Sequence, residues 1–95
     1  MKLNYKAVIL IVDDKQANLF ALEHLLLNKD RTILSATNGK DALKIALNKS
    51  IDLIILDVQM PDIDGFEVAQ ILKSNKKTND IPIILHLPSA PSISS

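Results

Sequence analysis

The stretch "LIILDVQMPDIDGFE", residues 53–67, carries an apolar run into a carboxylate and then into a turn. Its first four residues are apolar and partly β-branched, a composition typical of a strand that is covered on both faces of a sheet. Asp57 follows at once, so such a strand would hold its carboxylate rigidly at the carboxyl end. Asp64, three residues before Glu67, resembles the capping box that opens a helix. The stretch therefore predicts a buried strand, a loop that carries a carboxylate, and a helix.

Apolar runs typical of strands alternate with segments of helical period through the rest of the chain. Ala7–Val12 and residues 83–85 are further apolar runs that predict interior strands, and the more mixed Arg31–Ala36 predicts a strand nearer an edge. The segments between them have helical period, with Asn38 as the N-cap of the second helix and a Lys76-Lys77 pair near the end of the third. The residues expected to line the core-facing sides of these helices are Asn18, Ala21, Leu22, Leu25 and Leu26, then Leu43, Ala46 and Leu47, then Val68, Ile71 and Leu72.

Strands that alternate with helices predict an α/β fold with a parallel sheet, right-handed crossovers and helices on both faces. In sheets of this kind, ligands bind beyond the carboxyl ends of the strands, where the strand order reverses. Asp13 and Asp14 follow the first strand directly, and Asp57 follows the third. Two distant parts of the chain are thus expected to bring three carboxylates to one edge of one sheet.

The composition limits the classes of protein to which the chain can belong. Its 95 residues are 47% hydrophobic with only two glycines, which fits one small soluble domain. Eleven basic and eleven acidic residues give a formal net charge of zero, so the overall charge favours neither direct nucleic-acid binding nor attachment to a membrane. The chain has no cysteine, and its first apolar run stops too soon for a signal peptide or a membrane span. A cytoplasmic location is therefore expected.

Carboxylates gathered at one sheet edge repel one another, which is unfavourable unless a cation neutralises them. Oxygen ligands select Mg²⁺ or Mn²⁺ over zinc, and Mg²⁺ commonly works together with phosphates. A carboxylate can itself be the nucleophile of phosphoryl transfer and form an aspartyl-phosphate. Asp57 is the candidate acceptor because it stands alone on its strand, whereas Asp13 and Asp14 form a metal-holding pair.

The motifs "ILIVDD", "LIILDVQMPDIDGFE" and "IPII" together resemble the receiver domain of two-component response regulators and hybrid histidine kinases. The resemblance covers roughly residues 7–86 and implies a flavodoxin-like doubly wound parallel sheet, with the strand order 2-1-3-4-5. It implies that Asp57 accepts a phosphoryl group from a histidine kinase or a phosphotransfer protein in a Mg²⁺-dependent reaction. The role implied is signal transduction, not that of an enzyme.

The resemblance also implies a role for each site residue. Asp14 and Asp57 would ligate Mg²⁺ directly, and Asp13 would act largely through water. The backbone carbonyl of Gln59 would complete the protein's share of the coordination. The turn and loop that lead from the site into the third helix would be formed by Met60, Pro61 and Gly65.

The chain departs from the family pattern after its fourth strand. It supplies three strand-helix units and a fourth strand, whereas a receiver has five units, so the fold is expected to be incomplete. The hydroxyl that contacts the phosphoryl group in the family falls on Leu87, with Ser89 out of register, and no Lys stands at the end of a fifth strand. The expected division is a truncated receiver domain over residues 1–86 and an atypical Ser/Pro-rich tail over residues 87–95. A shifted reading frame, an artificial extension or a natural truncation would explain such a tail.

The histidines and lysines are expected to have surface or structural roles. Neither His24 nor His86 has a second histidine or a carboxylate at ligand spacing in the sequence. The lysines lie on predicted helix faces and ends, which is typical of solvated positions and not of a nucleic-acid-binding stripe.

The residues leave three functions open. The first is a signalling module that is phosphorylated on Asp57. The second is a metal-dependent phosphatase or phosphotransferase, which often needs an acid two residues after its nucleophile, where Gln59 cannot serve. The third is a receiver remnant that no longer switches and acts as an interaction or dimerisation module. Its fourth strand would be an apolar edge, so a homodimer or larger assembly through that strand is expected, by edge pairing or by exchange of segments.

Overall fold

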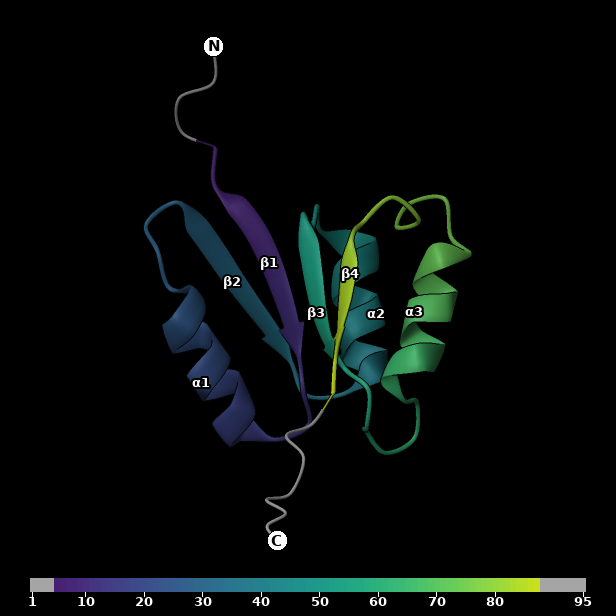
Figure 1. Ribbon diagram of the computed structural model, residues 1–95. Coiled ribbons are helices and arrows are strands. Elements are labelled where there is room, and N and C mark those ends of the chain that lie inside the picture. The colour runs from purple at the N-terminus through teal and green to yellow at the C-terminus, as the bar shows by residue number, and fades with distance from the viewer. Residues whose placement is uncertain (1–4, 88–95) are drawn as a thin grey trace, which may run out of the picture.

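A four-stranded parallel sheet forms the centre of the computed structural model (Figure 1). The structure describes residues 5–87, so Ser89 and nearly all of the predicted 87–95 tail lie outside the described residues. The elements in chain order are β1 (Ala7–Val12), α1 (Gln16–Leu26), β2 (Arg31–Ala36), α2 (Gly39–Asn48), β3 (Leu53–Asp57), α3 (Gly65–Lys73) and β4 (Ile83–His86). This order confirms the predicted alternation of strands and helices.

The strands lie in the order β2-β1-β3-β4, and every neighbouring pair is parallel. The chain leaves β1 to form β2 on one side and then returns to form β3 on the other, so the strand order reverses at β1. β2 is an edge strand, as its mixed composition predicts. β4 is the opposite edge among the described strands, whereas its apolar composition predicts an interior strand. No helix within residues 5–87 has the length and apolar content that a membrane span requires.

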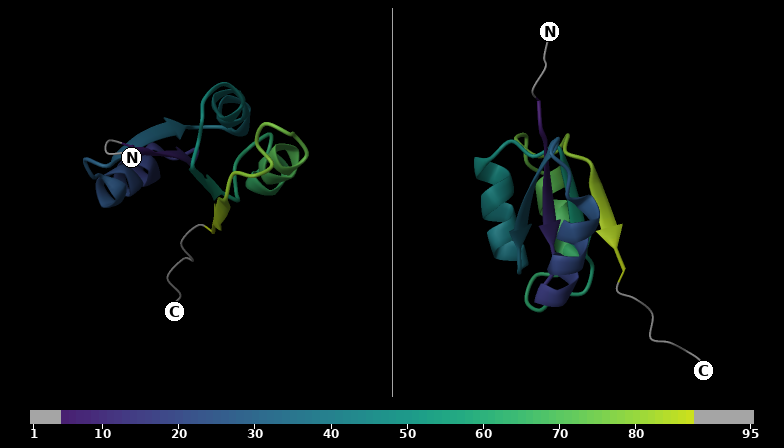
Figure 2. Two further views of the ribbon diagram at one scale, coloured as in Figure 1. Left: turned by 90° about the horizontal axis from the view of Figure 1, so that it is seen from above. Right: turned by 90° about the vertical axis from the view of Figure 1, so that its left-hand side faces the viewer.

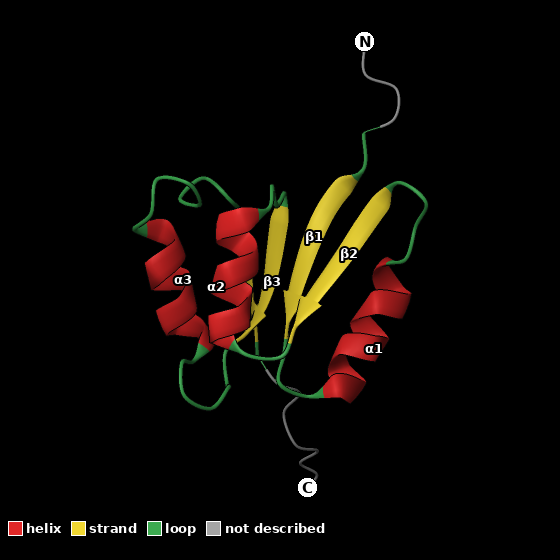
Figure 3. Ribbon diagram, turned by 180° about the vertical axis from the view of Figure 1, so that it is seen from behind, coloured by secondary structure: helices red, strands yellow, loops and turns green. Residues whose placement is uncertain are grey.

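The helices cover the two faces of the sheet unequally (Figures 2 and 3). On one face, α2 and α3 pack over the larger core, in which Leu10, Ile54 and Leu56 are fully buried. On the other face, α1 packs against the smaller cluster around Ile9 and Ile11. Successive strand residues alternate between these two clusters, as the period of two in a β-strand requires. The apolar runs are continuous because both faces of the central strands are covered.

The exposed fractions correct part of the predicted helix faces. Leu25 is 78% exposed, although it was expected to face the core. The residues by which α1 contacts the sheet are Leu19, Leu22 and Leu26. α1 packs on β1 and β2, and the exposed Leu25 lies outside this contact. Ile71 in α3 and Leu47 in α2 are likewise exposed at the margins of their helix faces.

The predicted helix starts are confirmed by side-chain capping. The Asn38 side chain accepts a hydrogen bond of 2.8 Å from the backbone N–H of Asp41, and Asp64 accepts one of 2.9 Å from that of Glu67. Each bond satisfies a donor that the first turn of a helix leaves free. The third helix ends at Lys73, before the Lys76-Lys77 pair that was expected to close it. The buried hydroxyl of Thr78 donates to the carbonyl of Leu72 at 2.6 Å and holds the chain that leaves this helix.

We predict that Gly65→Ala destabilises the fold by about 3 kcal/mol or more, because an added Cβ would overpack the backbone of the site loop. This Cβ would lie 2.9 Å from the carbonyl carbon of Asp57 and 2.9 Å from the Cα of Val58. Backbone atoms of a buried strand end cannot move aside as a side chain can. Urea unfolding followed by circular dichroism measures the loss.

Gly39→Ala is the matched control at the start of α2. Its added Cβ would lie 2.7 Å from a methyl group of the buried Val68 and 3.2 Å from the backbone oxygen of Ile63, so its closest contact is with a side chain and not with backbone. We expect a smaller loss than for Gly65→Ala, since the better helix propensity of Ala offsets part of the crowding. Equal losses for the two variants would contradict the close approach of Gly65 to the Asp57 backbone.

Candidate functional site

Three neighbouring strands each place one polar residue at the same edge of the sheet, because their apolar triplets are in register. The triplet of residues 10–12 in β1 pairs with residues 54–56 in β3, and these pair in turn with residues 83–85 in β4. The next residue along each strand is Asp13, Asp57 or His86, and Asp57 lies directly opposite His86. The site is therefore a row across the carboxyl ends of the three strands.

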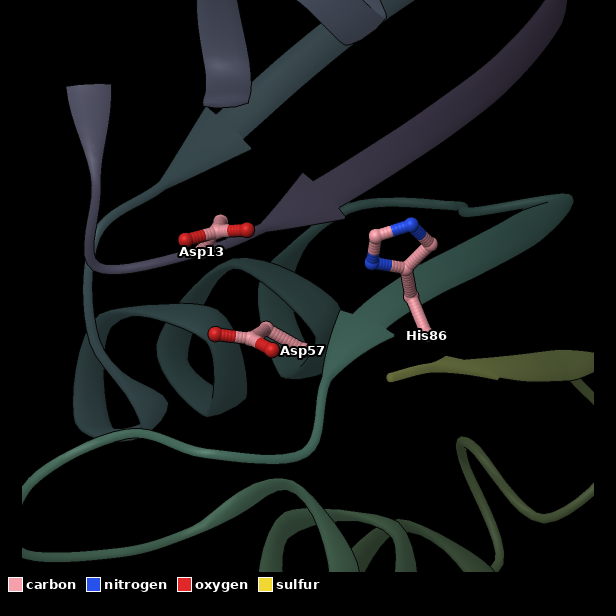
Figure 4. Close-up of side chains that lie close together, drawn as sticks. All are labelled: Asp13, Asp57 and His86. Carbon is pink, nitrogen blue, oxygen red and sulfur yellow. The ribbon is translucent and has the colours of Figure 1, made fainter. Parts of the chain in front are cut away.

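The side chains of this row converge (Figure 4). One carboxylate oxygen of Asp13, one of Asp57 and a ring nitrogen of His86 all lie within 4.8 Å of one another. The period of two along each strand explains why they share a face, since Asp57 lies two residues after Ile55 and His86 two residues after Ile84. The candidate site thus forms at the point where the strand order reverses.

Asp13 is held in place by the start of α1. Its side chain is buried, with 1% of the residue exposed. One carboxylate oxygen accepts a hydrogen bond of 2.9 Å from the backbone N–H of Lys15, and the other accepts one of 3.0 Å from the side-chain amide of Asn18. These bonds compensate the burial of the charge and fix the direction of the carboxylate.

Asp57 is also buried, but its carboxylate accepts far weaker hydrogen bonding than that of Asp13. Only 4% of the residue is exposed, and the one hydrogen bond that its carboxylate accepts among residues 5–87 is a long one of 3.4 Å from the backbone N–H of Gln59. Burial raises the pKa of Asp57 above its ordinary value, and the negative charge of Asp13 raises it further. Asp57 is therefore a poorly solvated carboxylate with an oxygen left for a cation or an electrophile.

Asp14 points to the same need for positive charge. One of its carboxylate oxygens is buried and accepts no hydrogen bond from the described residues. The amine of Lys15 lies 3.9 Å from this oxygen, which makes a distant ion pair. Asp14 does not belong to the group of ligand atoms that lie within 4.8 Å of one another. An orphaned oxygen beside two buried carboxylates fits a divalent cation with oxygen ligands.

The loop after β3 carries the other residues that the sequence singles out. Within this loop, the side chain of Met60 is buried, whereas Gln59 and Pro61 are exposed. Asp62 takes a left-handed backbone angle, with φ of 67°. The N–H of Gly65 donates to the carbonyl of Val58 at 3.0 Å and closes the loop against the end of β3. The roles of Gln59 in metal binding and of Met60, Pro61 and Gly65 as the turn stay predictions.

The expectation that His86 has a surface or structural role stays a prediction: its side chain is exposed, and a ring nitrogen lies within 4.8 Å of carboxylate oxygens of Asp13 and Asp57, which are distant in sequence. Sequence spacing could not show this. A signal was nevertheless present, since "IILD" at residues 54–57 and "IILH" at residues 83–86 differ only in their last letter. His24 lies in α1, where its ring contacts the carbonyl of Phe20. Leu87, at the expected hydroxyl position, is 68% exposed.

A family model described as the response regulator receiver domain matches residues 9–87. Among curated proteins, the chain is 42% identical over 79 residues to the response regulator PleD of Caulobacter vibrioides, and the match covers 83% of this chain and 17% of PleD. It is 42% identical over 80 residues to histidine kinase P4 of Formosa agariphila, which covers 84% of this chain and 6% of that protein. The chain thus spans less than a fifth of these two relatives.

Solved structures show the same fold. The response regulator TrrA of Thermotoga maritima, crystallised with Mg²⁺ and BeF, is 37% identical with a TM-score of 0.80, over 88% of this chain and 71% of that one. The chemotaxis protein CheY4 of Vibrio cholerae is 29% identical with a TM-score of 0.81, over 90% of this chain and 72% of that one. These matches confirm the predicted flavodoxin-like arrangement.

We predict that Asp57→Asn stabilises the metal-free protein at neutral pH, by about 1 kcal/mol, the usual size of a point-mutation effect. The folded-state pKa of Asp57 is raised, so ionising this carboxylate opposes folding. The penalty is absent below the unfolded-state pKa, grows as the pH rises through the window up to the folded-state pKa, and is complete above it. Thermal melting in EDTA from pH 4 to 8 measures it.

The matched control is Asp62→Asn, a change of the same chemistry on the exposed part of the loop. Its effect is expected to be small at every pH. A gain from Asp57→Asn that stays constant with pH, or a loss at pH 7, would contradict an unfavourable charge at Asp57.

Proposed function

Since this chain belongs to the response regulator receiver domain family, we propose that Asp57 accepts a phosphoryl group from the phosphohistidine of a histidine kinase or a phosphotransfer protein. The observation that carries the proposal is the buried Asp57 carboxylate, placed beside Asp13 at the reversal of the strand order with a single long hydrogen bond. A buried carboxylate without strong donors is a better nucleophile than a solvated one, because less hydration must be removed before it attacks.

The transfer is a displacement at phosphorus. A carboxylate oxygen of Asp57 forms the new P–O bond, the P–N bond of the phosphohistidine breaks, and its electron pair stays on the imidazole nitrogen of the donor protein. Asp13, held by the start of α1, keeps its fixed position beside the acceptor throughout. The products are an aspartyl-phosphate and a free histidine.

The metal expected at this site is Mg²⁺ or Mn²⁺. Asp13, Asp14 and Asp57 would hold it together with the backbone carbonyl of Gln59, and the bound ion supplies positive charge that offsets the phosphoryl oxygens. The orphaned oxygen of Asp14 supports this assignment. The relative TrrA was crystallised with Mg²⁺ and BeF.

Receiver domains are signalling modules, and we propose that this chain acts as one in the cytoplasm, with residues 1–86 as the domain. It would not turn over substrates as a phosphatase does, because Gln59 offers no acid two residues after Asp57. We also propose that it contacts neither nucleic acid nor membrane directly, given its balanced charge.

We predict that acetyl phosphate with Mg²⁺ adds one phosphoryl group to the chain, observed by intact mass spectrometry. Asp57→Asn is expected to abolish the addition, because the amide is not a nucleophile of comparable strength. EDTA is expected to reduce the rate by at least about 100-fold, since the metal is the main source of charge stabilisation.

Asp62→Asn is the control for carboxylates in the same loop and should be phosphorylated like the parent chain. Phosphorylation that survives Asp57→Asn would place the acceptor elsewhere. Consumption of many equivalents of donor without a stable adduct would instead support the phosphatase reading.

A second candidate function, self-association, is favoured by the free edge of β4. Ile84 is 51% exposed, Leu85 39% and Leu87 68%, and this edge pairs with no other described strand. Residues 81–87 contain no Lys, Arg, Asp or Glu that would discourage edge pairing. Pro82 removes one donor at the start of the run. We propose that two copies pair their β4 edges, because an isologous contact needs only one such surface.

Without a hydroxyl at Leu87, such a chain would transmit phosphorylation weakly and act mainly as an interaction module. We predict a dimer at micromolar concentration in sedimentation velocity, which dissociates on dilution. Ile84→Lys is expected to weaken association by at least about 10-fold, because it places a charge in the contact.

Leu25→Lys is the matched control, since Leu25 is a more exposed apolar residue on α1. It should leave association unchanged. A monomer over the whole dilution series would refute the proposal, and equal effects of the two variants would place the contact elsewhere.

A further inference from the structure

The unexpected member of the site is His86, which brings a nitrogen ligand to a pair of buried carboxylates. Its ring nitrogen, an oxygen of Asp13 and an oxygen of Asp57 lie within 4.8 Å of one another. In a tetrahedral site with metal–ligand bonds of about 2.1 Å, ligand atoms are roughly 3.4 Å apart. The His86 side chain is exposed, so its ring has room to turn toward the two carboxylates.

The ring nitrogens of His86 make no hydrogen bond with other residues of the range 5–87. The hydrogen bonds of the described residues include none to its ring nitrogens, and its backbone carbonyl accepts a bond of 3.2 Å from the N–H of Val58. That backbone bond, together with the register opposite Asp57, fixes where the side chain begins. The nitrogen is therefore available at a place that the strand pairing determines.

The burial and sparse hydrogen bonding of the acidic partners independently favour a cation. Asp57 is 4% exposed and accepts only one long hydrogen bond from the described residues, and an oxygen of Asp14 is buried without any. Asp13 is already oriented by two donors. Two buried carboxylates and one exposed imidazole make a three-ligand set at the carboxyl ends of three strands.

We propose that His86, Asp13 and Asp57 bind a borderline divalent cation of the Zn²⁺ type in preference to Mg²⁺. Imidazole suits Zn²⁺, Co²⁺ and Ni²⁺, whereas Mg²⁺ prefers oxygen ligands and keeps most of its waters. The site of the proposed phosphoacceptor is then also a Zn²⁺ site, and Zn²⁺ competes with Mg²⁺ for the two carboxylates. This inference rests on the proposed function, because both involve Asp13 and Asp57.

The test is a competition titration of the metal-free chain with Zn²⁺ against a chromophoric chelator, together with calorimetric titration with Mg²⁺. We expect His86→Gln to weaken Zn²⁺ binding by at least about 10-fold and to lower the Zn²⁺ to Mg²⁺ selectivity by a similar factor. Substitution with Co²⁺ gives a second readout, because the visible absorption of bound Co²⁺ depends on a nitrogen ligand and should change in the variant.

His24→Gln is the matched control, since it removes the other histidine, which lies on α1. It should leave Zn²⁺ affinity and the Co²⁺ spectrum as in the parent chain. Equal Zn²⁺ affinities of the parent and His86→Gln would overturn the inference, as would an equal loss in both histidine variants. Melting curves of both variants establish that they are folded.

Phosphorylation of the parent chain by acetyl phosphate in zinc-free Mg²⁺ buffer separates the two proposals. If it proceeds while His86→Gln binds Zn²⁺ like the parent, the phosphoacceptor stands and the zinc site is refuted. If the parent is not phosphorylated but loses Zn²⁺ affinity on His86→Gln, the zinc site stands and the proposed function is refuted.

Discussion

The equal register of β1, β3 and β4 is the constraint on which the rest of the structure depends. Hydrogen bonding aligns three apolar triplets side by side, so the residue after each triplet must fall in one row. The triplets of β1 and β3 are largely buried, which fixes the register of these two strands, because a slip by one residue would exchange the two faces of a strand. Asp13, Asp57 and His86 lie close together because β4 pairs with β3 in this same register.

This placement brings the carboxylates of Asp13 and Asp57 together, and the protein stabilises the two with different numbers of hydrogen bonds. Asp13 receives two donors from the start of α1, whereas Asp57 receives one long hydrogen bond and lies in its neighbour's field. Burial raises the pKa of Asp57, and the negative charge of Asp13 raises it further. The fold thus holds the Asp13 carboxylate rigidly and leaves the Asp57 carboxylate with few hydrogen bonds. Such a difference between neighbouring acidic groups is typical of functional sites.

The covering of the sheet is equally uneven, and it separates the site from the main core. α2 and α3 form one apolar layer with the even-numbered residues of β1 and β3, while α1 lies on the opposite face, mainly over β1 and β2. The row of site residues follows the strand positions that point to this second, less covered face. Exposed apolar groups of β4, such as Ile84, lie on it as well. The row of site residues and these exposed apolar groups therefore lie on one side of the sheet.

The sequence alone determined the order of elements, the parallel sheet, the helix caps at Asn38 and Asp64, and the carboxyl-end location of Asp13 and Asp57. These follow from local composition and period, which any stretch of chain displays by itself. The tertiary structure decided which apolar residues are covered, since Leu25 and Leu19 look alike in the sequence and only the position of α1 on the sheet exposes the first and buries the second. It also decided the role open to His86, because a contact across strands depends on register, and register is a property of the assembled sheet and not of one segment.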